Sequence, residues 1–249
     1  LVVIEADKYI PYPIDEINLD FEILGPSPKN SAMLDILIVA SRSENVNNRI
    51  EVINRAGLEP RIVDVESYAV ERAAQLLAND LPAQGRDKIV AIIDIGANYT
   101  HLFVLNGMKL IFSREEKFGG SQLTNAIAEY YNITPAQAWA AKNEGKLPAD
   151  YEVKVLEPFK ELVLLQIRRT LQFFYSTSQH GFVDHILLAG GVARQQGLAA
   201  HIQEQLGVTT TIANPLLSMT FSKNVNLKAI NEDAPTLIVA CGLALRNIH

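Results

Sequence analysis

Apolar residues at every second position mark the start of the chain as β-structure. They are Ile17, Leu19, Phe21 and Ile23. This spacing predicts a strand over residues 14–24 with one buried face, because successive side chains of a strand point to opposite sides. A second strand is predicted over 34–40. A helix is then expected over 45–56, capped by Ser43 or Asn45.

The spacing of apolar positions changes from two to three or four in the next segment, after a strand predicted over 61–65. Residues 66–79 are predicted to form an amphipathic helix. Its apolar face consists of Ala69, Val70, Ala73, Leu76 and Leu77. The polar break at 82–85 is a candidate domain boundary.

Three short apolar runs follow, over 89–93, 101–105 and 108–112. The last two are separated by Asn106-Gly107, a strong hairpin signal between β-rich runs. A three-stranded meander is therefore predicted over 88–114.

The remainder alternates helices with short strands, which is typical of an α/β protein. Thr134 and Pro135 are typical of a helix start. The predicted elements, in order, are a helix after Gly119-Gly120, a helix from Pro135 to about Gly145, a long helix over 158–178, a strand over 183–189, a helix from 195–197 to Gly207, a strand over 208–212, a loop-rich stretch over 214–234 and a last helix over 236–246.

Composition favours a soluble globular protein of one large or two smaller domains. The chain has 249 residues, of which 48% are hydrophobic and 20% charged. The single cysteine, Cys241, excludes a disulfide framework and a cysteine-based metal site. No apolar run approaches the roughly 18 residues that span a bilayer. The N-terminus lacks the pattern of a signal peptide.

The net charge of −6 is unevenly distributed. Residues 1–85 carry 7 Lys and Arg against 14 Asp and Glu. The absence of a basic stripe argues against nucleic-acid binding. The acidic first third could attract a basic segment of a partner, although an acidic surface more often serves solubility alone.

Candidate chemistry begins with the segment Asp94–Thr100 between the first two strands of the meander. Asp94 ends a strand, where it could hold Mg²⁺ or orient a water molecule. Gly96 lets the backbone approach a ligand closely, and the loop amides could cradle phosphate. On its own, this segment fits a plain hairpin turn equally well.

Two further glycine-bearing junctions, at 119–121 and 189–192, follow the same design. Such strand exits bind phosphate and ribose well, because free amides and the helix dipole favour anions. Lys142 could point toward a nucleotide and Arg194 could flank a base, with solvated side chains as the alternative. Trp139 is expected in the core or at an interface. No metal-ligand spacing of histidines, hydrolase elbow, P-loop or dinucleotide signature is present.

Several segments together resemble one known family over nearly the whole chain. The segment 94–100 is similar to the second phosphate motif of the actin/Hsp70/hexokinase fold, 188–193 to its adenosine motif and 115–124 to its ribose-side segment. Together with 5–13, 63–69 and 240–246, they resemble the PilM family of type IV pilus assembly, relatives of the division protein FtsA.

The resemblance implies an α/β actin-like ATPase (ribonuclease H-like) fold with an inserted subdomain called 1C. Subdomain 1C would comprise residues 1–60, and 1A would comprise 61–85 and 235–249. Subdomain 2A would comprise 86–120 and 183–234, and 2B would comprise 121–182.

The same resemblance implies a set of nucleotide-binding residues. Asp94, Gly96, Ala97, Asn98 and Thr100 would face the phosphates of ATP, with Asp94 also serving Mg²⁺. The remaining members would approach ribose and adenosine, and they are Gly119, Gly120, Lys142, Gly190, Gly191 and Val192.

The chain departs from the family pattern in two places. The first phosphate motif, expected ahead of subdomain 1C, is absent, so we expect residues upstream of Leu1 to be missing and the ATP site to be incomplete. Relatives often carry a glutamate three residues before the ribose-side lysine. Trp139 occupies that place here, which weakens the assignment of Lys142.

The resemblance implies a cytoplasmic ATP-binding scaffold of the pilus inner-membrane platform, with slow or no ATP turnover. Its implied partner is the N-terminal cytoplasmic tail of PilN, held in a groove for which Tyr9, Ile10 and Tyr12 are candidates. Other platform proteins and self-association are also implied, with membrane contact only through partners. The alternatives are a small-molecule kinase of the same fold and a filament-forming protein like FtsA.

Overall fold

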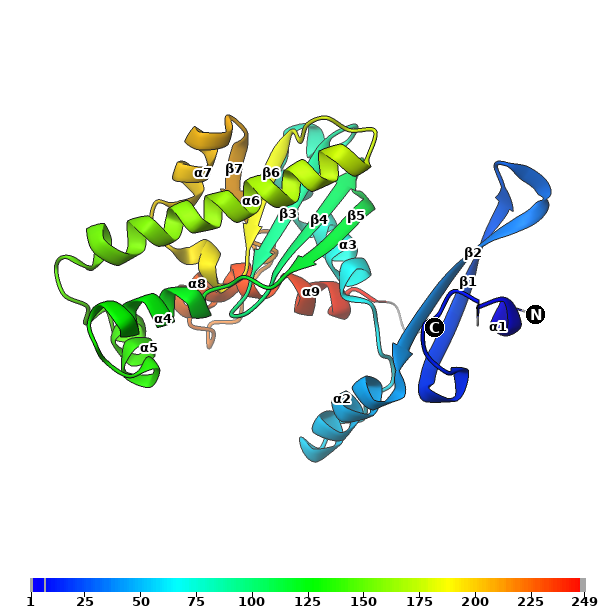
Figure 1. Ribbon diagram of the computed structural model, residues 1–249, viewed down its shortest axis with the longest axis horizontal. Helices are drawn as coiled ribbons and strands as arrows, with labels where there is room; N and C mark the ends of the chain where they lie inside the picture. The colour runs from blue at the N-terminus through cyan, green and yellow to red at the C-terminus, as the bar shows by residue number, and fades with distance from the viewer. Residues whose placement is uncertain (1, 7, 247–249) are drawn as a thin grey trace. The chain divides into compact units, whose positions relative to one another are not determined.

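The computed structural model describes residues 2–6 and 8–246, which form two compact units (Figure 1). Contacts divide the chain into Leu1–Val63 and Asp64–His249. The predicted boundary between subdomains 1C and 1A, at residues 60 and 61, lies three residues before this division. The other subdomain boundaries remain predictions. The candidate domain boundary at 82–85 is wrong, because these residues form a short turn within the second unit, with Ala83 and Gln84 in the left-handed conformation.

The first unit is built around a long two-stranded antiparallel ribbon. Its elements are α1 (Val2–Ala6), a 3-10 turn (Ile14–Glu16), β1 (Ile17–Ser27), β2 (Asn30–Arg42) and α2 (Ser43–Arg55). Both predicted strands and the helix are confirmed. The predicted caps are wrong, because the residue at the N-cap of α2 is Arg42 and no side chain caps the helix.

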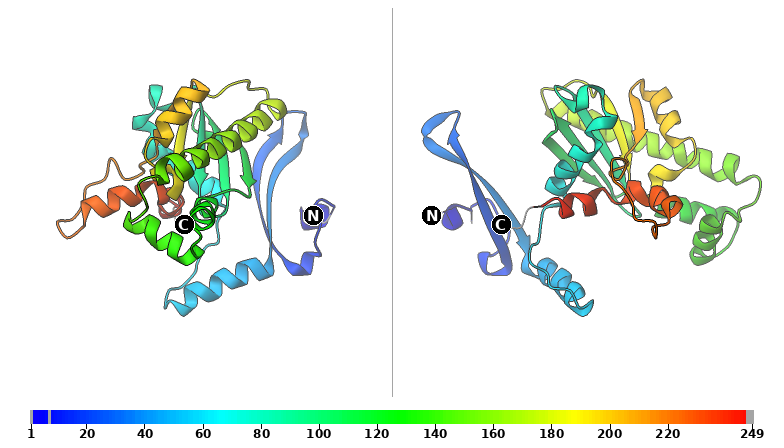
Figure 2. Two further views of the ribbon diagram at one scale, coloured as in Figure 1. Left: turned by 60° about the vertical axis from the view of Figure 1, so that its left-hand side comes forward. Right: turned by 180° about the vertical axis from the view of Figure 1, so that it is seen from behind.

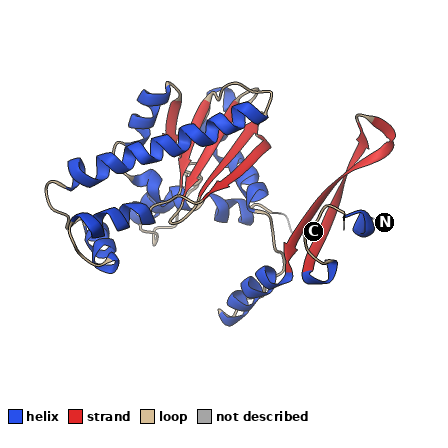
Figure 3. Ribbon diagram, viewed as in Figure 1, coloured by secondary structure: helices blue, strands red, loops and turns tan. Residues whose placement is uncertain are grey.

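The second unit is a three-layer α/β structure around a five-stranded sheet of order β5-β4-β3-β6-β7 (Figure 3). Its strands are β3 (Ile89–Ile95), β4 (Thr100–Asn106), β5 (Lys109–Glu116), β6 (His185–Ala189) and β7 (Thr209–Ile212). The predicted meander is confirmed, since β4 pairs antiparallel with both β3 and β5. Strand β6 runs parallel to β3 and β7.

The helices of the second unit are α3 (Glu66–Leu77), α4 (Ser121–Tyr130), α5 (Pro135–Glu144), α6 (Glu157–Thr177), α7 (Leu198–Leu206), α8 (Leu227–Asp233) and α9 (Ile238–Ala244). Several of them bury the two faces of the sheet. Ile93 of β3 belongs to one core cluster with α4, α6 and α7, and Ile92 to the other with α3 and α9. The two views in Figure 2 show these layers. Successive side chains of β3 therefore point alternately into the two hydrophobic cores, one on each face of the sheet.

Helices α3 and α9 come from distant parts of the sequence and pack closely against each other. A Cβ atom on Gly242 would lie 1.8 Å from the carbonyl oxygen of Ala69. Only glycine therefore allows this approach.

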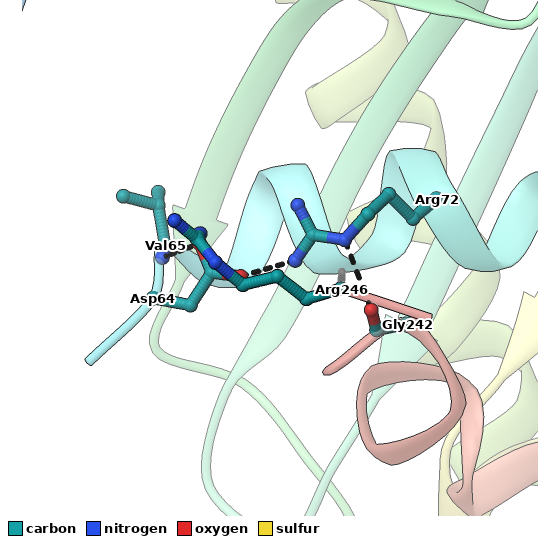
Figure 4. Close-up of polar contacts among 5 residues, drawn as sticks. All are labelled: Asp64, Val65, Arg72, Gly242 and Arg246. Atoms are coloured by element: carbon teal, nitrogen blue, oxygen red, sulfur yellow. Dashed lines mark hydrogen bonds and ion pairs between the residues drawn. The ribbon is translucent and has the colours of Figure 1, made fainter. Parts of the chain in front are cut away.

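A buried carboxylate ties the start of the second unit to α3 and to the residues that follow α9 (Figure 4). Asp64 is ion-paired with Arg72 of α3, and its Oδ1 lies 2.8 Å from Nη1 of Arg246. Arg72 also donates from Nε to the carbonyl of Gly242 at 3.0 Å. Burial alone would raise the pKa of Asp64, but the Val65 amide and the two guanidinium groups lower it below its ordinary value.

One sequence-based prediction fails in the loops, and a second is incomplete. Residues 61–65 form no strand, because this extended segment has no neighbouring strand with which to pair. The stretch 214–234 contains α8, which the side chain of Asn226 caps by accepting a hydrogen bond from the Ala229 amide at 3.2 Å. The last helix begins at Ile238, after a 3-10 turn over Ala234–Thr236.

Candidate functional site: a cavity between the glycine-bearing loops and helix α5

A cavity of about 590 Å³ opens where the β3–β4 loop, α4, α5 and the turn after β6 meet. All of its lining residues belong to the second unit. They are Gly96, Ala97, Gly120, Ser121, Leu123, Thr124, Trp139, Lys142, Asn143, Gly191, Val192, Arg194 and Gln195. The structure therefore brings the three predicted glycine junctions together around one space.

The loop after β3 is fixed by the N-terminus of α4. The Gly96 amide donates to the carbonyl of Tyr99 at 2.9 Å and closes the turn. The carbonyls of Gly96 and Ala97 accept hydrogen bonds from the amides of Gly120 and Ser121, at 2.9 and 2.7 Å. These two amides of α4 are therefore already occupied. In the described structure, the amides of Ala97 and Asn98 have no such backbone partner.

Two glycines allow the loops to approach this closely. A Cβ atom on Gly119 would lie 2.6 Å from the carbonyl carbon and oxygen of Ala97. Gly190 has φ of +81°, and a Cβ atom there would lie 2.4 Å from Oδ1 of Asp94. Neither residue lines the cavity. Because Gly119 and Gly190 have no side chain, the segments that line the cavity can pack directly against the β3–β4 loop and the end of β3.

Asp94 lies at the end of β3, beside the first residues after β6. In the sheet, its backbone lies opposite His101 of β4 and opposite Ala189 of β6. Burial raises the pKa of Asp94 to about 6, with Glu66 adding to the shift and His101 opposing it. A cation placed nearby would stabilise the ionised form. The carboxylate stands beside the cavity rather than in its wall.

Lys142 is the cation that the structure places in the wall without an acidic partner among the described residues. Its Nζ donates to Oγ1 of Thr124 at 3.1 Å. Burial lowers its pKa. Arg194 is a second cation in the wall, and it is ion-paired with Asp233 of α8 at 3.0 Å. The described lining contains no carboxylate, so the wall favours an anionic ligand.

The predicted site residues divide into those in the wall and those behind it. Gly96, Ala97, Gly120, Lys142, Gly191 and Val192 line the cavity. Asp94, Asn98, Thr100, Gly119 and Gly190 do not, and two of their side chains serve the loop. Buried Thr100 donates from Oγ1 to the Phe118 carbonyl at 2.9 Å, and Oδ1 of Asn98 accepts from the Ser121 hydroxyl at 2.7 Å.

Lys142 is the one residue of α5 that the sequence indicated as a nucleotide contact, whereas the structure places three residues of this helix at the cavity. Trp139 was expected in the core or at an interface, but its side chain is 60% exposed and lines the cavity. The core expectation is therefore wrong. Asn143 also lines the cavity. The helical spacing of 139, 142 and 143 places all three on one side of α5, and this spacing could have identified them.

The three candidate partner-binding residues lie in the first unit. Tyr9 is 80% exposed and Tyr12 is 40% exposed. The guanidinium of Arg42 lies 4.2 Å from the centre of the Tyr12 ring. Ile10 is partly buried. Two of the three side chains are thus accessible to another molecule.

Within the described ranges, no three His, Cys, Asp or Glu side chains gather closely enough to hold a metal ion. A single carboxylate such as Asp94 would suffice for Mg²⁺ that arrives with a nucleotide, because Mg²⁺ takes one or two carboxylates together with phosphate oxygens and water. None of the described helices has the length and apolar character needed to cross a bilayer.

Comparisons with solved structures support the fold. The chain is similar to a chain of a "PilM-PilN type IV pilus biogenesis complex", with 30% identity and a TM-score of 0.78, covering 98% of this chain and 70% of that one. It is also similar to the ethanolamine utilization protein EutJ from Carboxydothermus hydrogenoformans, with 20% identity and a TM-score of 0.59, over 83% and 62% of the two chains. MreB5 of Spiroplasma citri bound to ADP has 16% identity and a TM-score of 0.50, over 82% and 65%.

The last two likenesses show the fold alone, which is that of the actin-like ATPases. The chain spans between 62% and 70% of the length of these three chains. A family model described as type IV pilus assembly protein PilM matches residues 1–248. The chain therefore belongs to the PilM family of type IV pilus assembly proteins.

Proposed function

We propose that this protein is an ATP-binding scaffold of the type IV pilus assembly platform and that it binds the N-terminal segment of a PilN protein. The observation that carries the nucleotide part is the cavity, into which three glycine-bearing junctions and two cations converge without a carboxylate in its described lining. A nucleoside triphosphate matches that wall in charge, and the fold is shared with a protein solved with ADP.

The phosphates would lie against the β3–β4 loop, and Lys142 would approach the ribose. The amides of Ala97 and Asn98 would donate to phosphate oxygens, as backbone amides do in other anion sites. Asp94 would hold Mg²⁺, which supplies charge neutralisation of the phosphates. The described lining contains no Asp, Glu or His that could take a proton from water. Binding without rapid hydrolysis is therefore the expected behaviour.

The partner proposal rests on family membership and on the PilM-PilN complex that the chain resembles. Tyr9, Ile10 and Tyr12 are the proposed contacts, because Tyr9 and Tyr12 present exposed aromatic surface. Aromatic residues carry much of the binding energy in protein interfaces. The acidic first third would attract basic residues of the PilN segment. The protein would thus reach the membrane through this partner.

Substitution of Lys142 tests the nucleotide proposal. Lys142→Met removes the unpaired cation from the wall and is expected to weaken binding of Mg²⁺-ATP about ten-fold or more, because a charge-assisted hydrogen bond contributes about 1.5–3 kcal/mol. Lys146→Met is the control, since Lys146 is exposed and paired with Glu144 at 2.8 Å. Isothermal titration calorimetry measures both. Equal affinities for the two variants, or no ATP binding by the parent protein, would contradict the proposal.

Fluorescence anisotropy with a labelled PilN N-terminal peptide tests the partner proposal. Truncating Tyr9 and Tyr12 to alanine is expected to weaken binding at least ten-fold, in line with the loss of aromatic contacts at an interface. Phe182→Ala is the control, because Phe182 is an exposed aromatic residue in the second unit. If the peptide does not bind the full-length protein, the partner proposal fails.

A further inference from the structure

Trp139 is a large aromatic side chain that the fold holds at the surface of a cavity. It is 60% exposed, although helix α5 has a buried position next to it at Ala138. The helix is well anchored, because Thr134 and Gln137 form a capping box at its start and Gly145 ends it in the left-handed conformation. The ring is therefore placed at the cavity by an ordered helix, not by a loose end of the chain.

The surroundings of Trp139 indicate what kind of ligand would contact it. Lys142 and Asn143 follow on the same side of α5, and α5 packs on α4, whose Thr124 accepts the hydrogen bond from Lys142. The wall that faces them comes from other elements, through Gly191, Val192 and Arg194. An aromatic surface beside a cation, facing a second wall with a guanidinium, suits a flat ring that carries an anionic group.

We propose that Trp139 is the residue that contacts the ring of the bound nucleotide, by stacking its indole on the base. This inference rests on the proposed nucleotide function and adds the residue that recognises the base. The β3–β4 loop then holds the anionic part of the same molecule, and Lys142 approaches its ribose. Stacking on an aromatic side chain tolerates any base, since every base has a π-face. The site therefore discriminates between nucleotides and simple polyphosphates more than between one base and another.

The sequence itself provides the probe, because Trp139 is the only tryptophan in the chain. Its fluorescence reports directly on what contacts the indole. Titration with Mg²⁺-ATP is expected to change the emission, while Mg²⁺-tripolyphosphate is expected to bind in calorimetry and leave the emission nearly unchanged. A matching change with both ligands would overturn the stacking contact.

Substitutions give a second, independent readout by calorimetry. Trp139→Ala is expected to weaken ATP binding on the order of ten-fold, as removal of a base-stacking ring does, and to leave tripolyphosphate binding unchanged. Trp139→Phe keeps a stacking ring and is expected to retain most of the affinity. The control is Phe182→Ala, which removes an exposed aromatic ring that is not part of the cavity lining.

The outcomes separate this inference from the function on which it rests. If ATP binds and Trp139→Ala binds it as tightly as the parent protein, the stacking role is wrong and the nucleotide function stands. If Trp139→Ala loses affinity for PilN peptide instead, the indole belongs to a protein interface, which also overturns the inference. If the parent protein binds no nucleotide, both proposals fail. Circular dichroism of each variant excludes a folding defect.

Discussion

At the scale of single residues, the site combines a carboxylate that burial disfavours in its ionised form with glycines at positions where no side chain would fit. Asp94 is partly buried beside Gly190, and a methyl group on Gly190 would meet both Asp94 and the Ile95 carbonyl. The Asp94 pKa is raised to about 6, so its proton binds more tightly in the folded state than in the unfolded chain. A carboxylate kept in such a place is typical of a functional site.

The Asp94 pKa leads to a pH-dependent prediction. Because the folded pKa is about 6 and the unfolded value about 3.8, the contribution of Asp94 to stability is complete below about pH 4 and is lost as pH rises through 6. Asp94→Asn cannot ionise, so we expect it to be more stable than the parent at pH 7 by about 1–2 kcal/mol, after allowance for solvent screening. Urea unfolding at pH 4.0 and 7.0 measures this difference.

The same substitution should weaken binding of Mg²⁺-ATP if Asp94 holds the metal. The control is Glu204→Gln, since Glu204 is exposed and has no ion pair in the described structure. Its stability should follow the parent protein at both pH values. A parent and an Asp94→Asn variant with the same pH profile would show that the Asp94 carboxylate is not held as the structure indicates.

At the scale of secondary-structure elements, the sequence predicted well those helices and strands whose ends are marked by capping or turn residues. Helix α5 has its cap, its proline and its terminal glycine in the sequence, and the β3–β5 meander has its Asn-Gly turn. The strand predicted over 61–65 is wrong, and helix α8 was missed within a stretch predicted to be loop-rich. A strand requires a neighbour, which a local pattern cannot supply, and α8 has only seven residues with none buried, so it shows little apolar periodicity.

The close packing of α3 on α9 predicts that a side chain at Gly242 would destabilise the protein. Gly242→Ala would place a methyl group 1.8 Å from the Ala69 carbonyl oxygen, so the two helices must move apart. We expect a loss of about 2 kcal/mol or more in the free energy of unfolding, as overpacked cores show. Thermal and urea denaturation measure the loss. Gly181→Ala is the matched control, because a Cβ atom there meets nothing within 4 Å.

Separation of α3 from α9 would also disturb the ion pairs of Asp64, since Arg72 bonds to the Gly242 carbonyl (Figure 4). A Gly242→Ala variant as stable as Gly181→Ala would mean that the two helices have more freedom than the structure shows.

At the scale of the whole molecule, the chain divides into two units joined by an extended segment. Residues 58–65 form neither helix nor strand, and Arg61 within them is exposed. All residues that line the cavity follow this segment. The nucleotide function therefore belongs to the second unit, while the proposed PilN contacts belong to the first.

Limited proteolysis tests this division. Trypsin is expected to cut early after Arg61, because proteolysis favours exposed segments without regular structure. The fragment that starts at Ile62 should remain folded and bind Mg²⁺-ATP with nearly the affinity of the full chain. Arg61→Gln should slow this early cut. Rapid degradation of the fragment, or early cleavage mainly inside the sheet, would show that the second unit does not stand alone.

The sequence by itself determined the succession of most strands and helices, the family and the three glycine-bearing junctions. These features depend on local spacing and on residue types with special conformations. Only the tertiary structure decided which residues meet. It brought the junctions to one cavity, put Thr100 and Asn98 into the support of the loop and placed Trp139 at the wall. The physical reason is that burial and contact depend on neighbours far apart in sequence, whereas periodicity reports only which side of an element a residue occupies.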